Sequence, residues 1–375
     1  MPERIERPRT STRDYAVLRT NLESWLATKL PAGSEPAISG LEVPPGNGMS
    51  SETVTFDLTM SEGGGRRTSL SCVARMAPLD SAMPVFPRYE LDRQFRVMRL
   101  VGERTGVPVP RALWFEAEPD ALGSPLFVME HVDGAVPADV MPYNFEGWLL
   151  DAAPADRQRL QAATVEVLAG VHSLTPANAD LAFLEFDRAG PTALHRHVAE
   201  LRAYYEWVAR QCRHPLIERG FTWLDRHWPE PVGEPVLVWG DARIGNILYR
   251  DFRPVGVLDW EMAAVGPREL DLGWLIYHHR FFEELAGMAG LDGMPGFLTA
   301  SDVTDTYEAL TGHTVTDLGF YIVYAALRSA VVMARVAHRQ AYFGEREFPD
   351  DPDDVFYNRP GLEAMLAGGP GDAAG

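Results

Sequence analysis

The sequence predicts an α+β protein with two lobes, a small one containing a β-sheet and a larger, mainly helical one. The chain has 375 residues, 46% of them apolar and 23% charged, which is long enough to outgrow a single hydrophobic core. Short β-type segments dominate its first third, and helical periodicity dominates the remainder. The predicted boundaries are a helical N-terminal extension over 1–32, a small lobe over 33–133, a large lobe over 134–365 and a disordered tail over 366–375.

The first predicted element is an amphipathic helix over 11–30, whose apolar residues recur at helical spacing up to Pro31. Two β-type segments, 53–58 and 70–75, follow and are joined through the glycines at 63–65, a pattern typical of a hairpin. The other elements predicted for the small lobe are a helix over 91–101 and strands at 113–115 and 126–130.

The large lobe is predicted from long stretches with one apolar face each. These stretches are 155–174, 196–210, 270–286 and 318–341. One β-type interruption separates them, with strands expected at 236–239, 246–249 and 255–259. The polar residues of this interruption cluster at its strand ends, so the loops there are the place to look for chemistry.

Charge and cysteine usage exclude several classes of protein. The 34 basic and 53 acidic residues give a net charge of −19, which repels nucleic acid backbones and anionic membranes. Cys72 and Cys212 are the two cysteines and lack metal-ligand spacing, so neither a disulfide framework nor a zinc site is expected. The apolar stretch 320–338 contains arginines and is predicted to be a core helix. With no secretory signal at the start, a cytoplasmic protein is expected.

The strongest constellation of polar residues follows the strand predicted at 236–239. Asp241 leaves that strand, Asn246 comes five residues later, and Asp259 ends the strand that pairs with the returning chain. Oxygen ligands of this kind suit Mg²⁺ bound together with phosphates. The spacing from Asp241 to Asn246 also matches a kinase catalytic loop, in which the Asp accepts or orients the substrate hydroxyl. Arg243 then occupies the place of a phosphate-contacting cation.

Taken alone, a Gly-Asp string followed by Asn is more often a solvated turn than a catalytic loop. Other catalytic templates fail, because no GxSxG or HExxH occurs and the single lysine, Lys29, precedes Leu30 rather than Ser or Thr. The kinase interpretation therefore depends on the order of motifs along the whole chain.

These motifs together make the chain resemble the aminoglycoside phosphotransferase and choline kinase group, including the kinase-like domains found beside some acyl-CoA dehydrogenases. The resemblance covers roughly residues 35 to 345. The segments that carry it, besides the block from Gly240 to Glu261, are 46–51, Arg75 at a strand end, 107–110, 123–130 and 266–274.

This resemblance implies a two-lobed protein-kinase-like fold and an ATP- and Mg²⁺-dependent transfer of phosphate to a small-molecule hydroxyl. It implies that Asp241 orients the hydroxyl, that Asn246 and Asp259 hold metal, and that Arg243 contacts phosphate. The residues it implies for nucleotide binding are Gly48, Ser50, Ser51, Arg75, Glu130, His131 and Val132, the last three forming a hinge for adenine.

The sequence departs from the family pattern at three positions. Trp239 stands where the family usually has His, and Arg75 stands where a phosphate-binding lysine is usual. The third position is that of the helix carboxylate that normally pairs with this lysine, where Gln94 stands near the expected place and Glu90 one turn earlier on the same face. These departures motivate an alternative, a non-catalytic nucleotide-binding pseudokinase, and more remotely a scaffold that binds no nucleotide.

Three further polar residues lie on the helix predicted over 270–286. Asp271 is expected to cap that helix or to support the catalytic loop, outside the chemistry itself. His278 and His279 are expected to be packed or solvated rather than to line a substrate pocket. The acceptor is left open between an aminoglycoside, a macrolide, a hydroxyacyl compound and another metabolite, and so is the oligomeric state.

Overall fold

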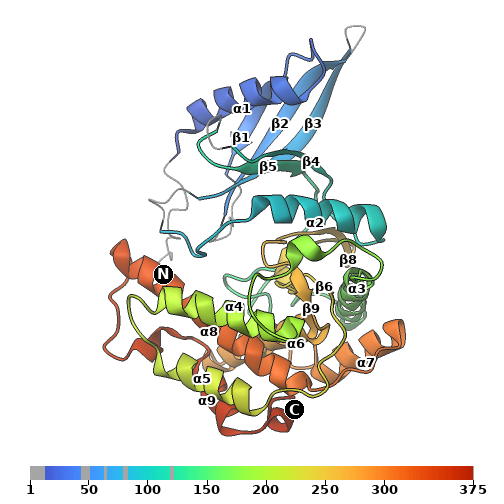
Figure 1. Ribbon diagram of the computed structural model, residues 1–375. Coiled ribbons are helices and arrows are strands. Elements are labelled where there is room, and N and C mark those ends of the chain that lie inside the picture. Colours follow the sequence, from blue (N-terminus) through green and yellow to red (C-terminus); the bar gives the residue numbers. More distant parts are fainter. Residues whose placement is uncertain (1–12, 44–50, 63–65, 79–82, 119–121, 375) are drawn as a thin grey trace. The chain divides into compact units, whose positions relative to one another are not determined.

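The computed structural model describes residues 13–43, 51–62, 66–78, 83–118 and 122–374 (Figure 1). They form two compact units. The smaller unit contains residues up to 100, 110–132 and 342–345, and the larger unit contains 101–109, 133–341 and 346 onward. The glycines at 63–65, which were expected to form the turn of the first hairpin, lie outside the described residues.

The smaller unit is built on a five-stranded antiparallel sheet of order β1-β2-β3-β5-β4. Its strands are β1 (Ala37–Glu42), β2 (Glu52–Glu62), β3 (Arg66–Met76), β4 (Ala112–Glu116) and β5 (Leu126–Glu130). The hairpin predicted from 53–58 and 70–75 is confirmed by β2 and β3, which pair with Thr55 opposite Val73. Residues alternate between buried and more exposed along most of β2, because one face of the sheet meets the core.

Helix α1 (Tyr15–Lys29) begins after Asp14, whose side chain accepts hydrogen bonds from the backbone of Ala16 and Val17. The predicted helix is therefore confirmed, but it is not a separate extension. Leu22 and Leu26 are fully buried in one core cluster with residues of the sheet, and Figure 1 shows α1 lying along the sheet. The apolar stripe of α1 is thus the cover of the smaller unit's core.

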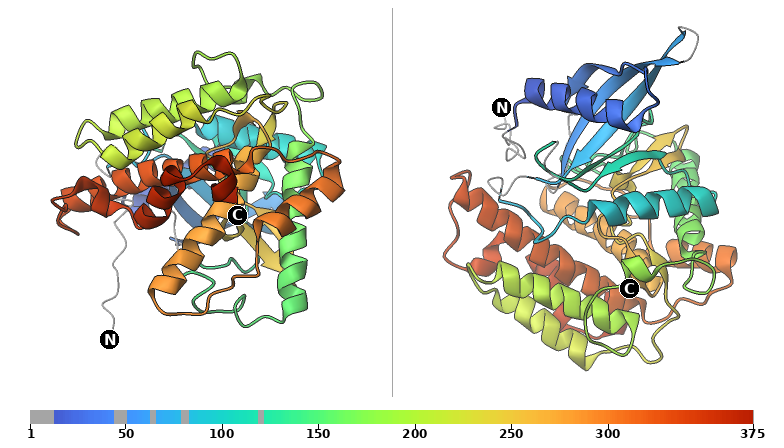
Figure 2. Two further views of the ribbon diagram at one scale, coloured as in Figure 1. Left: turned by 90° about the horizontal axis from the view of Figure 1, so that it is seen from below. Right: turned by 45° about the horizontal axis from the view of Figure 1, so that its top comes forward.

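Helices dominate the larger unit, and the four predicted there are confirmed as α3 (Pro154–His172), α4 (Ala193–Val208), α6 (Glu269–Met288) and α8 (Leu318–Tyr342). The structure adds α5 (Pro215–Arg226), α7 (Ala300–Thr311) and α9 (Arg359–Ala367). Helix α7 packs against α3 and α6, and α9 packs against α5 (Figure 2). Helix α2 (Leu91–Arg104) joins the two units, with its last residues belonging to the larger one.

The β interruption of the larger unit consists of two separate two-stranded ribbons. Strand β7 (Ile247–Arg250) pairs with β8 (Arg253–Val257), as expected. Strand β6 (Val236–Val238) pairs instead with β9 (Ala264–Gly266), a strand that the sequence pattern did not predict. The segment from Trp239 to Asn246 connects the two ribbons, because it lies between the end of β6 and the start of β7.

Helix α8 is long and apolar enough to cross a membrane by length and composition, yet 78% of its most apolar window is buried inside the protein. Arg335 and Arg339 of this helix are also buried, at 5% and 2% exposure. A helix with buried arginines and protein on all sides is a core helix, as its sequence predicted.

The predicted disordered tail is wrong over most of its length. Residues Pro370–Ala374 form the short helix α10, and Ala373 is buried. Two side chains of the larger unit donate hydrogen bonds to tail carbonyl oxygens, Trp223 Nε1 to Gly368 at 3.1 Å and Arg280 Nη1 to Ala373 at 2.5 Å. The tail is therefore held through its backbone, which its small side chains gave no reason to expect.

Buried neutral histidines predict that acid destabilises the larger unit. Burial, reinforced by the nearby His214 and Arg335, lowers the pKa of His338 from 6.5 to about 4. Below pH 6.5 the unfolded chain therefore binds more protons than the folded chain, so stability is complete above that pH and falls as pH drops towards 4. At pH 5 each such histidine costs about 2 kcal/mol. We expect the free energy of unfolding of His338→Met, measured by urea titration, to fall less between pH 7 and pH 5 than that of the wild type, by about this amount. Equal losses in variant and wild type would contradict this.

Candidate active site

The loop after β6 starts with a glycine that no other residue could replace. Gly240 follows β6 with a φ of +88°, and a Cβ atom there would lie 2.0 Å from the carbonyl oxygen of Met262. Both the left-handed backbone and the close approach of another segment require glycine. This turn sends Asp241 away from the buried strand and fixes where its side chain emerges.

Asp271 holds the backbone of this turn. Its two carboxylate oxygens accept hydrogen bonds from the N–H groups of Trp239 at 2.6 Å and of Gly240 at 2.8 Å. The same carboxylate accepts from His172 Nε2 at 3.1 Å, and His172 Nδ1 is bonded to the Tyr307 hydroxyl at 2.8 Å. Asp271 is fully buried and does not cap its helix, so its role is to support the loop.

Trp239 links the loop to the end of β8. Its indole Nε1 donates to the carbonyl oxygens of Leu258 at 2.9 Å and of Asp259 at 3.2 Å, and its ring packs against Trp260. The sequence suggested that Trp239 in place of histidine would require a different loop support. The structure shows that support, because the indole N–H ties the Asp241 loop to the Asp259 turn.

Asp241 lies at the centre of the site and is 9% exposed. Its oxygens accept from Trp274 Nε1 at 2.7 Å, Asn246 Nδ2 at 2.7 Å and Arg243 Nε at 3.2 Å. Burial raises the pKa of this carboxyl group, but the Arg243 charge, His278 and the hydrogen bonds from Asn246 and Trp274 outweigh burial and lower it to about 2. Asp241 is therefore a fixed carboxylate at neutral pH.

Arg243 is held by two carboxylates. Its Nε contacts Asp241, and its Nη1 forms an ion pair with Asp139. Burial lowers the pKa of Arg243, but the two carboxylates more than compensate and raise it. A Cβ atom at Gly245 would lie 2.4 Å from the Asp139 carboxylate, so the glycine between Arg243 and Asn246 makes room for this partner. Asp139 lies about a hundred positions before Arg243 in a segment without a motif, and the sequence did not predict it.

The backbone segments that carry Asn246 and Asp259, the predicted metal ligands, are hydrogen-bonded to each other. The Asn246 carbonyl oxygen accepts a hydrogen bond from the Leu258 N–H at 2.9 Å, and Asp259 follows with a φ of +58°. A non-glycine residue in this region is uncommon and often marks a functional site. The pair offers amide and carboxylate oxygens, which is the donor chemistry of Mg²⁺. Among the described residues no group of three His, Cys, Asp or Glu is gathered as a metal cage.

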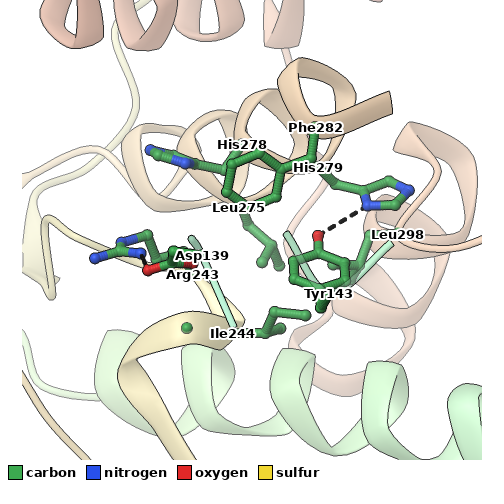
Figure 3. A pocket seen from close by; sticks show the side chains of 10 residues that line it. Asp139, Tyr143, Arg243, Ile244, Leu275, His278, His279, Phe282 and Leu298 are labelled. Carbon is green, nitrogen blue, oxygen red and sulfur yellow. Dashed lines mark hydrogen bonds and ion pairs between the residues drawn. The ribbon is translucent and has the colours of Figure 1, made fainter. Parts of the chain in front are cut away.

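A small cavity lies beside Arg243 (Figure 3). Its lining is Asp139, Tyr143, Arg243, Ile244, Gly245, Leu275, His278, His279, Phe282 and Leu298. The Tyr143 hydroxyl is bonded to His279 Nδ1 at 2.9 Å, and His279 Nε2 donates to the Met294 carbonyl oxygen at 3.1 Å. His278 and His279, which were expected to be packed or solvated rather than to line a pocket, both line this one, and Tyr143 was not predicted from the sequence.

The predicted nucleotide residues of the smaller unit are described in part. Arg75 Nη2 donates to the Ser51 hydroxyl at 2.7 Å, so two of them meet, whereas Gly48 and Ser50 lie outside the described residues. In the predicted hinge, the Glu130 side chain accepts from Arg111 at 3.0 Å. The backbone N–H groups of Glu130 and His131 donate to the carbonyl oxygens of Arg111 and Ser71, and Val132 ends the segment.

The two candidates for the partner of Arg75 differ in their surroundings. Glu90 accepts a hydrogen bond from Arg93 at 2.8 Å, and Gln94 is buried at 2% exposure.

Lys29, the only lysine of the chain, forms an ion pair with Glu116 at 3.2 Å and lies over the Trp25 ring. It is therefore engaged in packing α1 onto the sheet.

Comparison with known protein families shows which family the chain belongs to. Residues 83–295, more than half of the chain, match the phosphotransferase enzyme family. The chain belongs to this phosphotransferase family. The resemblance inferred from its motifs is thereby confirmed, and the matched segment contains every residue of the Asp241 site named above except Tyr307 and Leu298.

Curated relatives of this phosphotransferase-family chain are larger proteins. Acyl-CoA dehydrogenase family member 11 from Rattus norvegicus is 31% identical over 214 residues, 56% of this chain and 25% of that protein. The Homo sapiens protein of the same name is 31% identical over 202 residues, 53% of this chain and 24% of that protein. The chain thus spans about a quarter of the length of these relatives.

Solved structures show the same fold over more than nine tenths of the chain. A candidate aminoglycoside phosphotransferase from Ralstonia eutropha has a TM-score of 0.64 and 22% identity, covering 92% of this chain and 96% of that one. The GDP complex of aminoglycoside 2′-phosphotransferase-IIIa has a TM-score of 0.54 and 14% identity, covering 93% and 98%. These likenesses confirm the predicted two-lobed α+β, protein-kinase-like fold of this phosphotransferase-family chain.

Proposed function

We propose that this chain is an ATP- and Mg²⁺-dependent phosphotransferase that moves the γ-phosphoryl group to a hydroxyl of a small molecule. The observation that carries the proposal is the ionised Asp241, fixed by Trp274, Asn246 and Arg243 next to the cavity. A carboxylate with fixed orientation accepts the hydrogen bond of an entering hydroxyl and aims its oxygen at phosphorus. Catalysis of phosphoryl transfer is mostly such positioning together with charge neutralisation.

Asp241 acts in this proposal as an orienting group rather than as a strong base. A pKa of about 2 means that it holds a proton poorly at neutral pH. Transfer through a loose transition state needs little basicity, because the hydroxyl proton is lost late. Arg243, which the two carboxylates keep charged, supplies a fixed positive charge beside the path of the phosphoryl group.

Asn246 and Asp259 are the residues that would hold Mg²⁺, which neutralises phosphate charge when bound. Trp239 bonds to the carbonyl oxygen of Asp259 at 3.2 Å, so the ligand turn and the Asp241 loop are linked. For the nucleotide, the proposal assigns phosphate contacts to Arg75 and Ser51 with the glycine-rich segment around Gly48 and Ser50. Glu130, His131 and Val132 would form the adenine hinge.

The alternative is a non-catalytic nucleotide-binding protein. It is favoured by the engagement of the two arginines that would replace lysine chemistry. Arg243 pairs with Asp139 and Asp241, and Arg75 bonds to Ser51. An arginine differs from lysine in reach and geometry, so binding without transfer is the outcome that this alternative predicts.

Thermal unfolding with ligands tests the proposal. We expect Mg²⁺ and ATP together to raise Tm by several degrees, because a ligand at 100 times its Kd stabilises the folded state by about 2.7 kcal/mol. Asp259→Ala should remove most of that shift, since it deletes one proposed metal ligand. Asp305→Ala, which removes an exposed carboxylate on α7, is the matched control and should keep it. GTP is measured in parallel, because one structural neighbour is a GDP complex.

The outcomes separate the two functions. A shift with both ligands, followed by phosphate transfer to any hydroxyl, supports the phosphotransferase. A shift without transfer to any of a broad panel of aminoglycosides, macrolides and hydroxyacyl thioesters would favour the non-catalytic alternative. No shift with either nucleotide at millimolar concentration contradicts both.

A further inference from the structure

Two adjacent histidines of α6 differ in how their ring nitrogens are satisfied. His279 has a partner at each nitrogen, the Tyr143 hydroxyl and the Met294 carbonyl oxygen. Neither nitrogen of His278 has a hydrogen-bond partner among the described residues, although both are enclosed. Figure 3 shows the two rings leaving α6 on different sides, with His278 on the side of Arg243. Buried polar atoms are nearly always bonded, so a missing partner at His278 calls for an explanation.

The position of His278 connects it to the proposed chemistry. Its ring lies 4.6 Å, centroid to centroid, from the ring of Trp274, and Trp274 Nε1 donates to Asp241 at 2.7 Å. His278 also lines the cavity beside Arg243. A molecule in that cavity would therefore meet His278 while its hydroxyl is within reach of the Asp241 side.

We propose that His278 positions the phosphate acceptor, and that this acceptor is an alcohol whose atoms around the hydroxyl are uncharged and mostly apolar. This inference rests on the phosphotransferase function proposed above. One neutral imidazole offers one donor and one acceptor, which is enough to bind the hydroxyl itself or a neighbouring carbonyl or ether oxygen.

The protonation of His278 agrees with an uncharged partner. Burial lowers its pKa, and the Arg243 and Arg328 charges add to this effect against the opposing Asp241, giving a value of about 3. The imidazole is thus neutral at physiological pH. It has no charge with which to attract an anionic group or to form an ion pair.

The rest of the lining points the same way. Asp139, the one carboxylate in the lining, already forms an ion pair with Arg243. The side chains of Ile244, Leu275, Phe282 and Leu298 are hydrocarbon. A polycationic acceptor would have to leave water for this surface without gaining a free carboxylate. The net charge of −19 acts at long range and does not change this local balance.

We therefore assign selectivity for the hydroxyl-bearing end of the acceptor to His278 and to the apolar side chains that line the cavity with it.

The test compares acceptors and two His278 variants in the full chain. The neutral probes are cyclohexanol, 2-hexanol and methyl 3-hydroxyhexanoate, and the polycationic probe is kanamycin, each assayed for phosphate-ester formation and for a rise in Tm with Mg-ATP present. We expect at least one neutral probe to be phosphorylated with a kcat/KM at least about tenfold above that of kanamycin. A charged group of kanamycin would lose its hydration at this surface without gaining an ion pair, which costs at least about 1.4 kcal/mol.

His278→Phe keeps an aromatic ring against Trp274 but removes both hydrogen-bonding atoms, and His278→Asn keeps a donor and an acceptor. We expect His278→Phe to raise the acceptor KM about five- to twelvefold, since one buried hydrogen bond is worth about 1–1.5 kcal/mol. The KM for ATP should stay within about twofold, and the Mg-ATP shift in Tm within about one degree. His278→Asn should recover part of the loss. If His278→Phe does not fold, His278→Leu takes its place.

Several results would overturn the inference. An unchanged acceptor KM in His278→Phe removes the role of His278. Preference for kanamycin, or failure of every neutral probe both to react and to raise Tm, removes the acceptor class. The Mg-ATP shift in wild type is measured first, so its absence marks failure of the proposed function rather than of the acceptor assignment.

Discussion

Asp241→Asn should lower kcat by about 10²- to 10⁴-fold, the usual contribution of a group that handles the reacting proton and oxygen. The amide keeps the size of the side chain but loses the negative charge that orients the hydroxyl. It also places N–H groups against donors, because Trp274, Asn246 and Arg243 all donate to the present carboxylate. The variant should still bind Mg-nucleotide, because the proposed metal ligands are Asn246 and Asp259. The measurement is steady-state turnover beside the Mg-ATP shift in Tm.

The control for this variant is Asp305→Asn, which changes an exposed carboxylate of the same unit and should leave turnover unaltered. Because the pKa of Asp241 is about 2, its ionisation is complete throughout the usual assay range, and an acidic limb of the rate profile above pH 4 would belong to another group. Equal losses of turnover and nucleotide binding in Asp241→Asn would contradict an orienting role.

Elements with a long periodic pattern were the ones that sequence reasoning could place. The stripes of α3, α6 and α8 repeat over several turns, so each predicted a buried face that the structure contains. Strand β9 has three residues, too few to show an alternation, and its pairing with β6 depends on chain 26 or more positions away. The tail failed for a different reason, because its contacts are made by backbone carbonyls that no side-chain pattern reports.

The residues of the candidate site also fall into those that the sequence could predict and those that it could not. Asp241, Arg243 and Asn246 lie within six consecutive positions, so their meeting could be anticipated from one loop. Asp139 could not, since its segment shows no motif and its ion pair with Arg243 exists only in the folded chain. Trp274 and His278 had a usable signal. They follow Asp271 by three and seven positions, which places all three on one face of a helix, and Asp271 was already expected at the loop.

Asp271→Ala should produce the largest loss of stability of any single substitution near the site. The carboxylate is fully buried and accepts from the backbone N–H groups of Trp239 and Gly240 and from His172. Removing it leaves these donors without an acceptor at a place water does not reach. Each unmet donor costs about 1–3 kcal/mol and breaking a buried charged network about 3–5, so we expect about 4 kcal/mol in urea unfolding.

We attribute this loss to the hydrogen bonds that Asp271 accepts, not to the general effect of a carboxylate in the first turn of a helix. Two matched variants separate these two contributions. Asp302→Ala removes an exposed carboxylate from the first turn of α7 and should cost at most about 1 kcal/mol. Tyr307→Phe removes the hydroxyl bonded to His172 at 2.8 Å and should cost about 1 kcal/mol. Because the Tyr307 hydroxyl is linked to Asp271 through His172, adding Tyr307→Phe to Asp271→Ala should cost less than it does alone. Additive losses, or less than about 1 kcal/mol for Asp271→Ala, would mean that the loop is held by other contacts.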